Sequence, residues 1–150
     1  MKKVGLYISV LYLFSLLISC STGLSQKEFE DLNIKISNIQ SWLNLMPGGP
    51  GSFHITGKYE LPENLNEKEI FLDKIIIMEK DKEIYSLTAE LQLFYNSEMG
   101  IKEFTFSNYY QTKIDPVLIK KDTIEVKLIF SVNGLLIRKD FGVIPLLRVY

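Results

Sequence analysis

Apolar and polar residues alternate strictly over residues 53–61 and 85–93, and over residues 123–132 every second residue from Ile124 to Val132 is apolar. A period of two places every second side chain on the same face, which is typical of a β-strand with one buried face. Residues 70–78 are β-branched and apolar on both faces, as in a strand that lies between neighbours. The only helical signal is a capping-box pattern at 25–28, which predicts a single turn.

Turn signals separate these stretches. The Pro-Gly-rich segment at 47–52 ends one strand, because proline and glycine in this density do not continue a ladder. Asn133-Gly134 predicts a two-residue hairpin, since both positions tolerate a positive φ. Pairing across this turn predicts the partners Val132 with Leu135, Phe130 with Ile137, Ile129 with Arg138, Lys127 with Asp140 and Leu128 with Lys139.

Two segments depart from simple alternation. Residues 33–46 begin with Ile34 and Ile36 on one face and then change parity at Ile39, which predicts a β-bulge or a strand that changes sheets. The last segment, 143–150, is interrupted by Pro145. Because proline cannot donate to a ladder, we expect this segment to be an edge strand.

Together these patterns predict an all-β fold, a single β-sandwich of seven or eight antiparallel strands over residues 33–150. In strand number and length the region resembles the immunoglobulin-like and fibronectin type III domains. It lacks the two inter-sheet cysteines of antibody domains, and Ile124 stands where a tyrosine corner would place tyrosine. The resemblance implies a fold and does not identify a family.

The N-terminus has the layout of a secretory signal. Lys2 and Lys3 precede an apolar run from Val4 to Ile18, which is shorter than the roughly 20 residues of a membrane-spanning helix. The sequence Leu17-Ile18-Ser19-Cys20 then resembles the lipobox of bacterial lipoproteins. That resemblance implies that residues 1–19 are removed and that Cys20 is lipidated. The alternative is ordinary cleavage after Ser21, which would discard Cys20.

A lipidated Cys20 predicts a place at a membrane of the cell envelope. Its two or three acyl chains would hold the protein firmly, and about ten extended residues of a tether within 20–32 would keep the domain within about 35 Å of the bilayer. In a bacterium with an outer membrane, the neutral Ser21 resembles the sorting pattern of lipoproteins that face the periplasm. Without residues 1–19 the formal net charge changes from -1 to -3, so nucleic acid is not an expected partner.

The sequence contains no recognisable catalytic constellation. His54 is the only histidine, so a cluster of histidine ligands for a metal cannot form, and any Ser-His-Asp arrangement would need this residue. No serine lies in a Gly-x-Ser-x-Gly motif. The carboxylates of Glu60, Glu63, Glu67, Glu69 and Asp73 do not have the spacing of a calcium loop. We therefore expect no cofactor, no metal and no enzymatic activity. A hydrolase that uses His54 or surface carboxylates is the alternative.

Three aromatic residues are the candidates for recognition. Trp42 precedes the Pro-Gly segment, and Tyr109 and Tyr110 lie in the irregular stretch before Pro116. Such side chains are frequent at interfaces and in glycan-binding sites, but Trp42 could equally pack in the core. Exposed strand edges are a second candidate. The sequence thus predicts a membrane-anchored, non-enzymatic sandwich that binds or scaffolds another component of the cell envelope, with a glycan-binding module as the alternative.

Overall fold

The computed structural model describes residues 26–96, 100–109 and 112–150. The predicted signal, Cys20 and Tyr110 lie outside these residues. The described chain contains a short helix, eight strands and one 3-10 helix, in the order α2 (Gln26–Asp31), β1 (Lys35–Asn44), β2 (Ser52–Pro62), β3 (Ile70–Glu79), β4 (Lys82–Thr88), β5 (Glu90–Asn96), β6 (Ile101–Ser107), η1 (Pro116–Lys120), β7 (Thr123–Val132) and β8 (Leu135–Val149).

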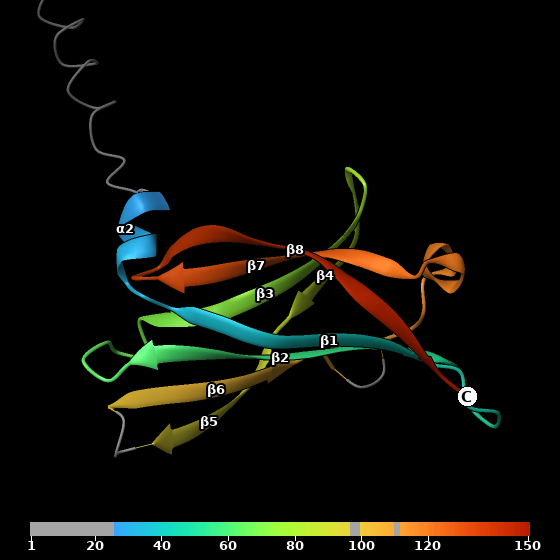
Figure 1. Cartoon of the computed structure of the whole chain (residues 1–150), viewed down its shortest axis with the longest axis horizontal. Coiled ribbons are helices and arrows are strands. Elements are labelled where there is room, and N and C mark those ends of the chain that lie inside the picture. Colours follow the sequence, from blue (N-terminus) through green and yellow to red (C-terminus); the bar gives the residue numbers. More distant parts are fainter. Residues whose placement is uncertain (1–25, 97–99, 110–111) are drawn as a thin grey trace, which may run out of the picture.

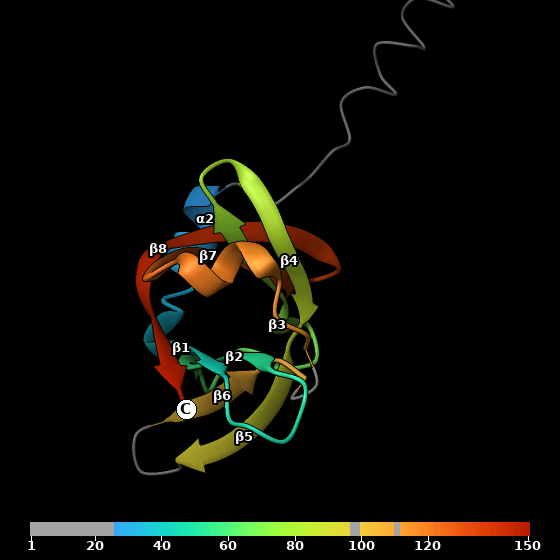
Figure 2. The same ribbon diagram turned by 90° about the vertical axis from the view of Figure 1, so that its right-hand side faces the viewer.

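The strands form one curled sheet in the order β4-β3-β7-β8-β1-β2-β6-β5. Its two halves, β4-β3-β7-β8 and β1-β2-β6-β5, face each other as the layers of a sandwich (Figure 1). The view along the strands shows the two layers on opposite sides of the molecule (Figure 2), and the buried side chains of the core lie between them. The prediction of an all-β sandwich is therefore confirmed.

The strand order corresponds to that of an immunoglobulin-type sandwich. The half β1-β2-β6-β5 corresponds to its ABED sheet, and β8-β7-β3-β4 corresponds to its GFC sheet with an added C′ strand. One pairing differs from the expected antiparallel arrangement, because β1 and β8 run parallel over residues 41–44 of β1. This parallel pairing joins the two halves into one sheet.

The core lies between the halves and follows the alternation in the sequence. Phe53, Ile55, Tyr59 and Leu61 of β2 are all buried, as the pattern predicts. The ring of Tyr59 stacks on Phe104 at 4.8 Å and meets Phe130 edge-on at 5.4 Å. Burial raises the pKa of Tyr59 far above its ordinary value, so this hydroxyl stays neutral in the folded protein.

The parity change in β1 is a bulge, as predicted. The register with β2 shifts between Ser37 and Gln40, and Asn38 takes a φ of 54°. Beyond the bulge Ile39 packs against Gly57 of β2, and a Cβ at Gly57 would lie 2.9 Å from Ile39 Cγ1. The ring of Phe106, the strand partner of Gly57, occupies the rest of this space. Only glycine leaves room here for both side chains.

The hairpin at Asn133 and Gly134 has the predicted geometry. Both residues have a positive φ, 52° and 81°, and all five predicted pairs between β7 and β8 occur. The register shifts only beyond Lys127, where β8 has one extra residue. Lys139, which shares the apolar face with Leu128, reaches Glu30 of α2 at 3.6 Å. The short helix thus gives a charged partner to a side chain that the strand pattern alone leaves unexplained.

One predicted strand is divided between both halves. The alternation over residues 85–93 predicts a single strand, but the chain leaves the edge of one half at Thr88 and joins the edge of the other at Glu90. The N–H of Ala89, between them, donates to the carbonyl of Asp73. Because the crossing uses neither glycine nor proline, the side-chain pattern continues through it without a break.

The prediction that residues 143–150 form an edge strand is wrong. They belong to β8, which lies between β7 and β1. The N–H of Leu146 donates to Asp122 on the β7 side, so the nitrogen of Pro145 points toward β1. The parallel ladder with β1 begins only at Leu146, and the hydroxyl of Ser41 donates to the Pro145 carbonyl at 2.8 Å. Proline is tolerated because its nitrogen lies where the ladder starts.

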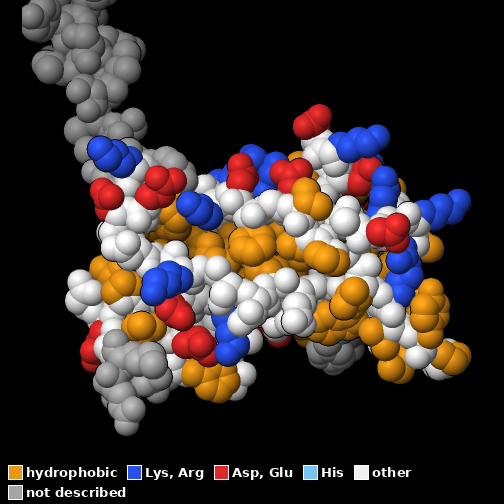
Figure 3. Space-filling view, in the orientation of Figure 1, with side chains coloured by type: hydrophobic (Ala, Val, Ile, Leu, Met, Phe, Trp, Pro, Cys, Tyr) orange, Lys and Arg blue, Asp and Glu red, His pale blue; other side chains and the backbone are white. Residues whose placement is uncertain are grey.

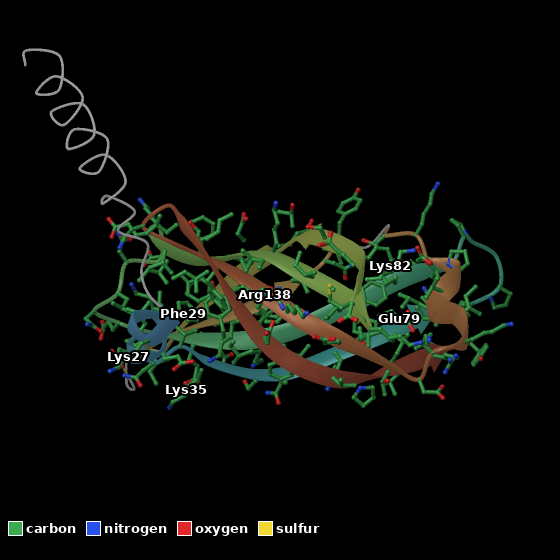
Figure 4. All side chains as sticks on the ribbon, turned by 90° about the horizontal axis from the view of Figure 1, so that it is seen from above. Lys27, Phe29, Lys35, Glu79, Lys82 and Arg138 are labelled. Atoms are coloured by element: carbon green, nitrogen blue, oxygen red, sulfur yellow. The ribbon has the colours of Figure 1, made fainter. Side chains whose placement is uncertain are left out.

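Helix α2 packs at the hairpin end of the sandwich, where the ring of Phe29 lies 5.3 Å from that of Phe130. The C-terminus lies at the opposite end (Figure 1). In the view from above, Phe29 is at the α2 end, and Glu79 and Lys82 lie toward the other end (Figure 4). Within the described residues no helix is long and apolar enough to cross a bilayer.

We predict that Gly57→Ala lowers the free energy of unfolding by about 1–3 kcal/mol, because its methyl group overlaps Ile39 and Phe106 in a closely packed region. Gly49→Ala is the matched control, since a Cβ there meets nothing within 4 Å. Urea unfolding followed by circular dichroism measures both variants. Equal stability of the two would contradict the close approach of β1 and β6 over Gly57.

Candidate functional site

Trp42 and His54 form a stacked pair on the outer face of the sandwich. They are strand partners in β1 and β2, their ring centroids lie 5.1 Å apart, and the ring planes differ by 10°. The neighbours of Trp42 along β1, Ser41 and Leu43, point into the core. The alternative that Trp42 is a core residue is therefore wrong: its side chain is half-buried on the outside.

Beside Trp42, the outer face of β8 is apolar. Leu147 is the partner of Trp42 in the parallel ladder and is 57% exposed. Val143, Pro145 and Val149 lie on the same face at alternate positions and are also exposed, Val143 at 69%. We call these four residues of β8, together with Trp42, the apolar strip. Hydrophobic side chains run along the middle of this face toward the end that holds the C-terminus (Figure 3).

The apolar strip has a polar border. Glu125 is the strand partner of Val143, and Asn44 is the partner of Val149. Nearer α2, Arg138 and Asp140 form an ion pair at 2.8 Å. An apolar centre with a polar rim is the usual composition of a protein interface.

The position of Trp42 limits what its ring can bind. His54 covers one face of the indole, and Leu147 occupies the adjacent strand position on the other side. A sugar that stacks on tryptophan needs an open ring face. The stacking on His54 therefore leaves at most one face of the Trp42 ring for a sugar.

The segment that carries Tyr109 lies on the far side of β2 from Trp42. It continues the line of β6, and the side chain of Asn108 holds it to β2: Oδ1 accepts from Ile55 N at 2.8 Å, and Nδ2 donates to Phe53 O at 2.9 Å. Nδ2 also donates to the hydroxyl of Thr112 at 2.8 Å. Tyr109 is exposed, but it is separated from Trp42 by a whole strand, so the structure does not combine them in one platform.

Ser52 and His54 share a hydrogen bond of 2.7 Å between Oγ and Nε2. Burial lowers the pKa of His54, so its imidazole is neutral at pH 7 and can accept a proton. A serine nucleophile also needs a group that orients the histidine and donors for an oxyanion. Among the described residues no carboxylate contacts His54. The pair therefore contains two components of a catalytic triad without the third.

Two of the carboxylates considered in the sequence, Glu60 and Glu67, form separate ion pairs. Glu67 binds Lys102 at 2.6 Å, and this hydrogen bond lowers the pKa of Glu67, whereas Glu60 lies 3.9 Å from Lys35. No group of three metal-ligating side chains occurs among the described residues. A hollow of about 170 Å³ is lined by Asn33, Pro62, Ile101 and the Lys35–Glu60 ion pair.

Sequence reasoning found Trp42 but missed its neighbours on β8. The signal is present: residues 143–149 are apolar on both faces except at Arg148, which is typical of a strand covered on both sides. Pro145 led instead to the edge-strand interpretation. In the structure only one side is covered, because the side chains of Ile144 and Leu146 enter the core and the others remain exposed.

The sequence matches no protein-family model, and neither a curated protein nor a solved structure shows significant similarity to it.

We predict that the single imidazole signal of this protein titrates below pH 6.5 in NMR, because Trp42 shields His54 from water. Trp42→Ala exposes the ring and should move the midpoint upward, toward 6.5. Leu136→Ala is the control, since it removes an exposed side chain of β8 outside the strip. A wild-type midpoint at or above 6.5 would contradict the stacked arrangement.

Proposed function

We propose that this chain is a lipid-anchored, non-enzymatic β-sandwich that binds another protein of a bacterial cell envelope through the apolar strip. The anchor is Cys20, on the strength of the lipobox-like sequence Leu17-Ile18-Ser19-Cys20. The observation that carries the binding proposal is the exposed outer face of β8 and Trp42. In a bacterium with an outer membrane, the neutral Ser21 favours a location that faces the periplasm.

With Cys20 as the proposed anchor, the apolar strip would lie away from the membrane surface. Residue 20 precedes the first residue of α2 by six positions, which span at most about 20 Å. Helix α2 lies at the hairpin end of the sandwich, beside Phe130 and Lys139. Leu147 is eight residues further along β8 than Lys139, a distance of about 26 Å. A protein held at α2 therefore presents the strip toward the space beyond the membrane surface.

The composition of the strip supports a protein partner. Outer positions of a sandwich are normally polar, whereas Val143, Pro145, Leu147 and Val149 form an unbroken apolar row. Continuous apolar patches of this kind on soluble domains commonly mark interaction sites. One ring face of Trp42 is already covered by His54, which reduces the area on which a sugar could stack.

We predict that Leu147→Asp removes the specific partner from the proteins that co-purify with the full chain from detergent-solubilised envelopes. A carboxylate in the centre of the strip would be buried without a counter-charge, which opposes binding. The matched control is Leu136→Asp, which makes the same change on β8 outside the strip, at a residue that is 64% exposed. Unchanged co-purification after Leu147→Asp, or equal loss with both variants, would contradict a role of the strip.

The anchor is tested separately. We predict that Cys20→Ser yields an unprocessed or soluble product that no longer partitions with membranes, because serine cannot carry the thioether-linked lipid. Fractionation of cells that express both forms measures this. A processed Cys20→Ser protein that still partitions with membranes would show that the lipid assignment is wrong, and would leave the binding result at Leu147 unaffected.

A further inference from the structure

The two ends of the curled sheet are the edge strands β4 and β5, and they differ in how well they are protected. Edge strands expose backbone N–H and C=O groups to other chains, and natural proteins block them with charges, prolines, bulges or covering segments. At β4 two of these devices are present: Lys82 and Glu83 are charged, and the register with β3 shifts beside them.

At β5 the only one of these devices among the described residues is the charge of Glu90, the first residue of the strand. Its register with β6 is unbroken over seven pairs, and no described segment pairs with its outer edge. Residues 91–95 are uncharged and contain no proline. Leu91, Leu93 and Phe94 are 37%, 45% and 48% exposed, although Leu91 and Leu93 are the strand partners of the buried Phe106 and Phe104. The edge is therefore able to accept another strand, which would also cover these side chains.

We propose that the occupant of this edge is a second copy of the chain, paired antiparallel through β5. Directly opposite residues of antiparallel strands share a face, so a symmetric pairing must preserve the inward and outward positions. The register centred on Leu93 satisfies this condition and uses all seven residues of β5. It places Leu93 opposite itself, Gln92 opposite Phe94, Leu91 opposite Tyr95 and Glu90 opposite Asn96.

The charges of β5 fit this pairing. Glu90 is the only charged residue of the strand, and it falls opposite a neutral partner, so no like charges face each other. The same symmetric pairing at β4, centred on Tyr85, would have to cross the register shift between Glu83 and Tyr85. Two-fold pairing of identical surfaces is also the commonest way in which a protein forms a dimer.

The geometry agrees with two anchors in one membrane. A two-fold axis through an antiparallel strand pair is perpendicular to the sheet, so both copies show the same face of the joined sheet. In each copy α2 packs against β7 and β8, on the inner side of the half that contains β5. Both tethers therefore leave from the same side. The dimer leaves the apolar strip of each copy open, so this proposal does not depend on the proposed partner.

The test is oxidative cross-linking of the full chain in isolated membranes. In the register centred on Leu93 the two symmetry-related Cα atoms lie about 4.5–5.5 Å apart, within the range of a disulfide. We expect Leu93→Cys to give a dimer on a non-reducing gel. The unsubstituted chain controls for Cys20, and Leu87→Cys, on β4, is the matched control for the other edge.

A charge exchange tests the same register without a cysteine. The double variant Gln92→Lys, Phe94→Lys places a lysine at position 92 of each copy opposite a lysine at position 94 of the other. We expect this repulsion to weaken co-purification of two differently tagged copies roughly tenfold. Glutamate at both positions should do the same, and a mixture of the two variants should restore the pairing. The matched control is Ser86→Lys on β4. Absence of the Leu93→Cys dimer together with no restoration by the mixture would overturn the proposal.

Discussion

The pairing of β1 with two different strands determines the arrangement of this molecule. Its first half pairs only with β2, and after the bulge at Asn38 its second half also pairs with β8. This double pairing closes the sandwich on one side, and the absence of a side chain at Gly57 makes room for it. It also brings together Trp42 and Leu147, two residues that lie 105 positions apart in the sequence. The apolar strip therefore results from the parallel pairing of β1 with β8.

The local features of the fold were predictable because short-range rules govern them. The hairpin at Asn133-Gly134, its register and the bulge in β1 all follow from turn chemistry and from the parity of apolar residues. The division of the strand at Ala89 and the central position of β8 were not predictable in this way. Both depend on which strands become neighbours in space, and alternation describes the faces of a strand but not its partners.

The candidate site shows the same limit. Trp42 could be chosen from its residue type, but its stacking on His54 and its position beside β8 come from the ladder. The hydrogen bonds of Asn108, which hold the segment of Tyr109 to β2, join residues more than 50 positions apart and have no sequence motif. The predicted lipid anchor at Cys20, in contrast, depends on no long-range contact. It follows only from the contiguous residues 1–20, which are outside the described structure.

The apolar strip, which extends away from α2, and the open edge at β5 lie on different parts of one domain. The proposed function requires that the strip contacts a partner protein in the cell. A photo-cross-linking amino acid at position 147, activated in intact cells, tests this directly, with position 136 on the same strand as the control. We predict a discrete adduct with one envelope protein from position 147 and none from position 136. No adduct from position 147, or the same adducts from both positions, would contradict it.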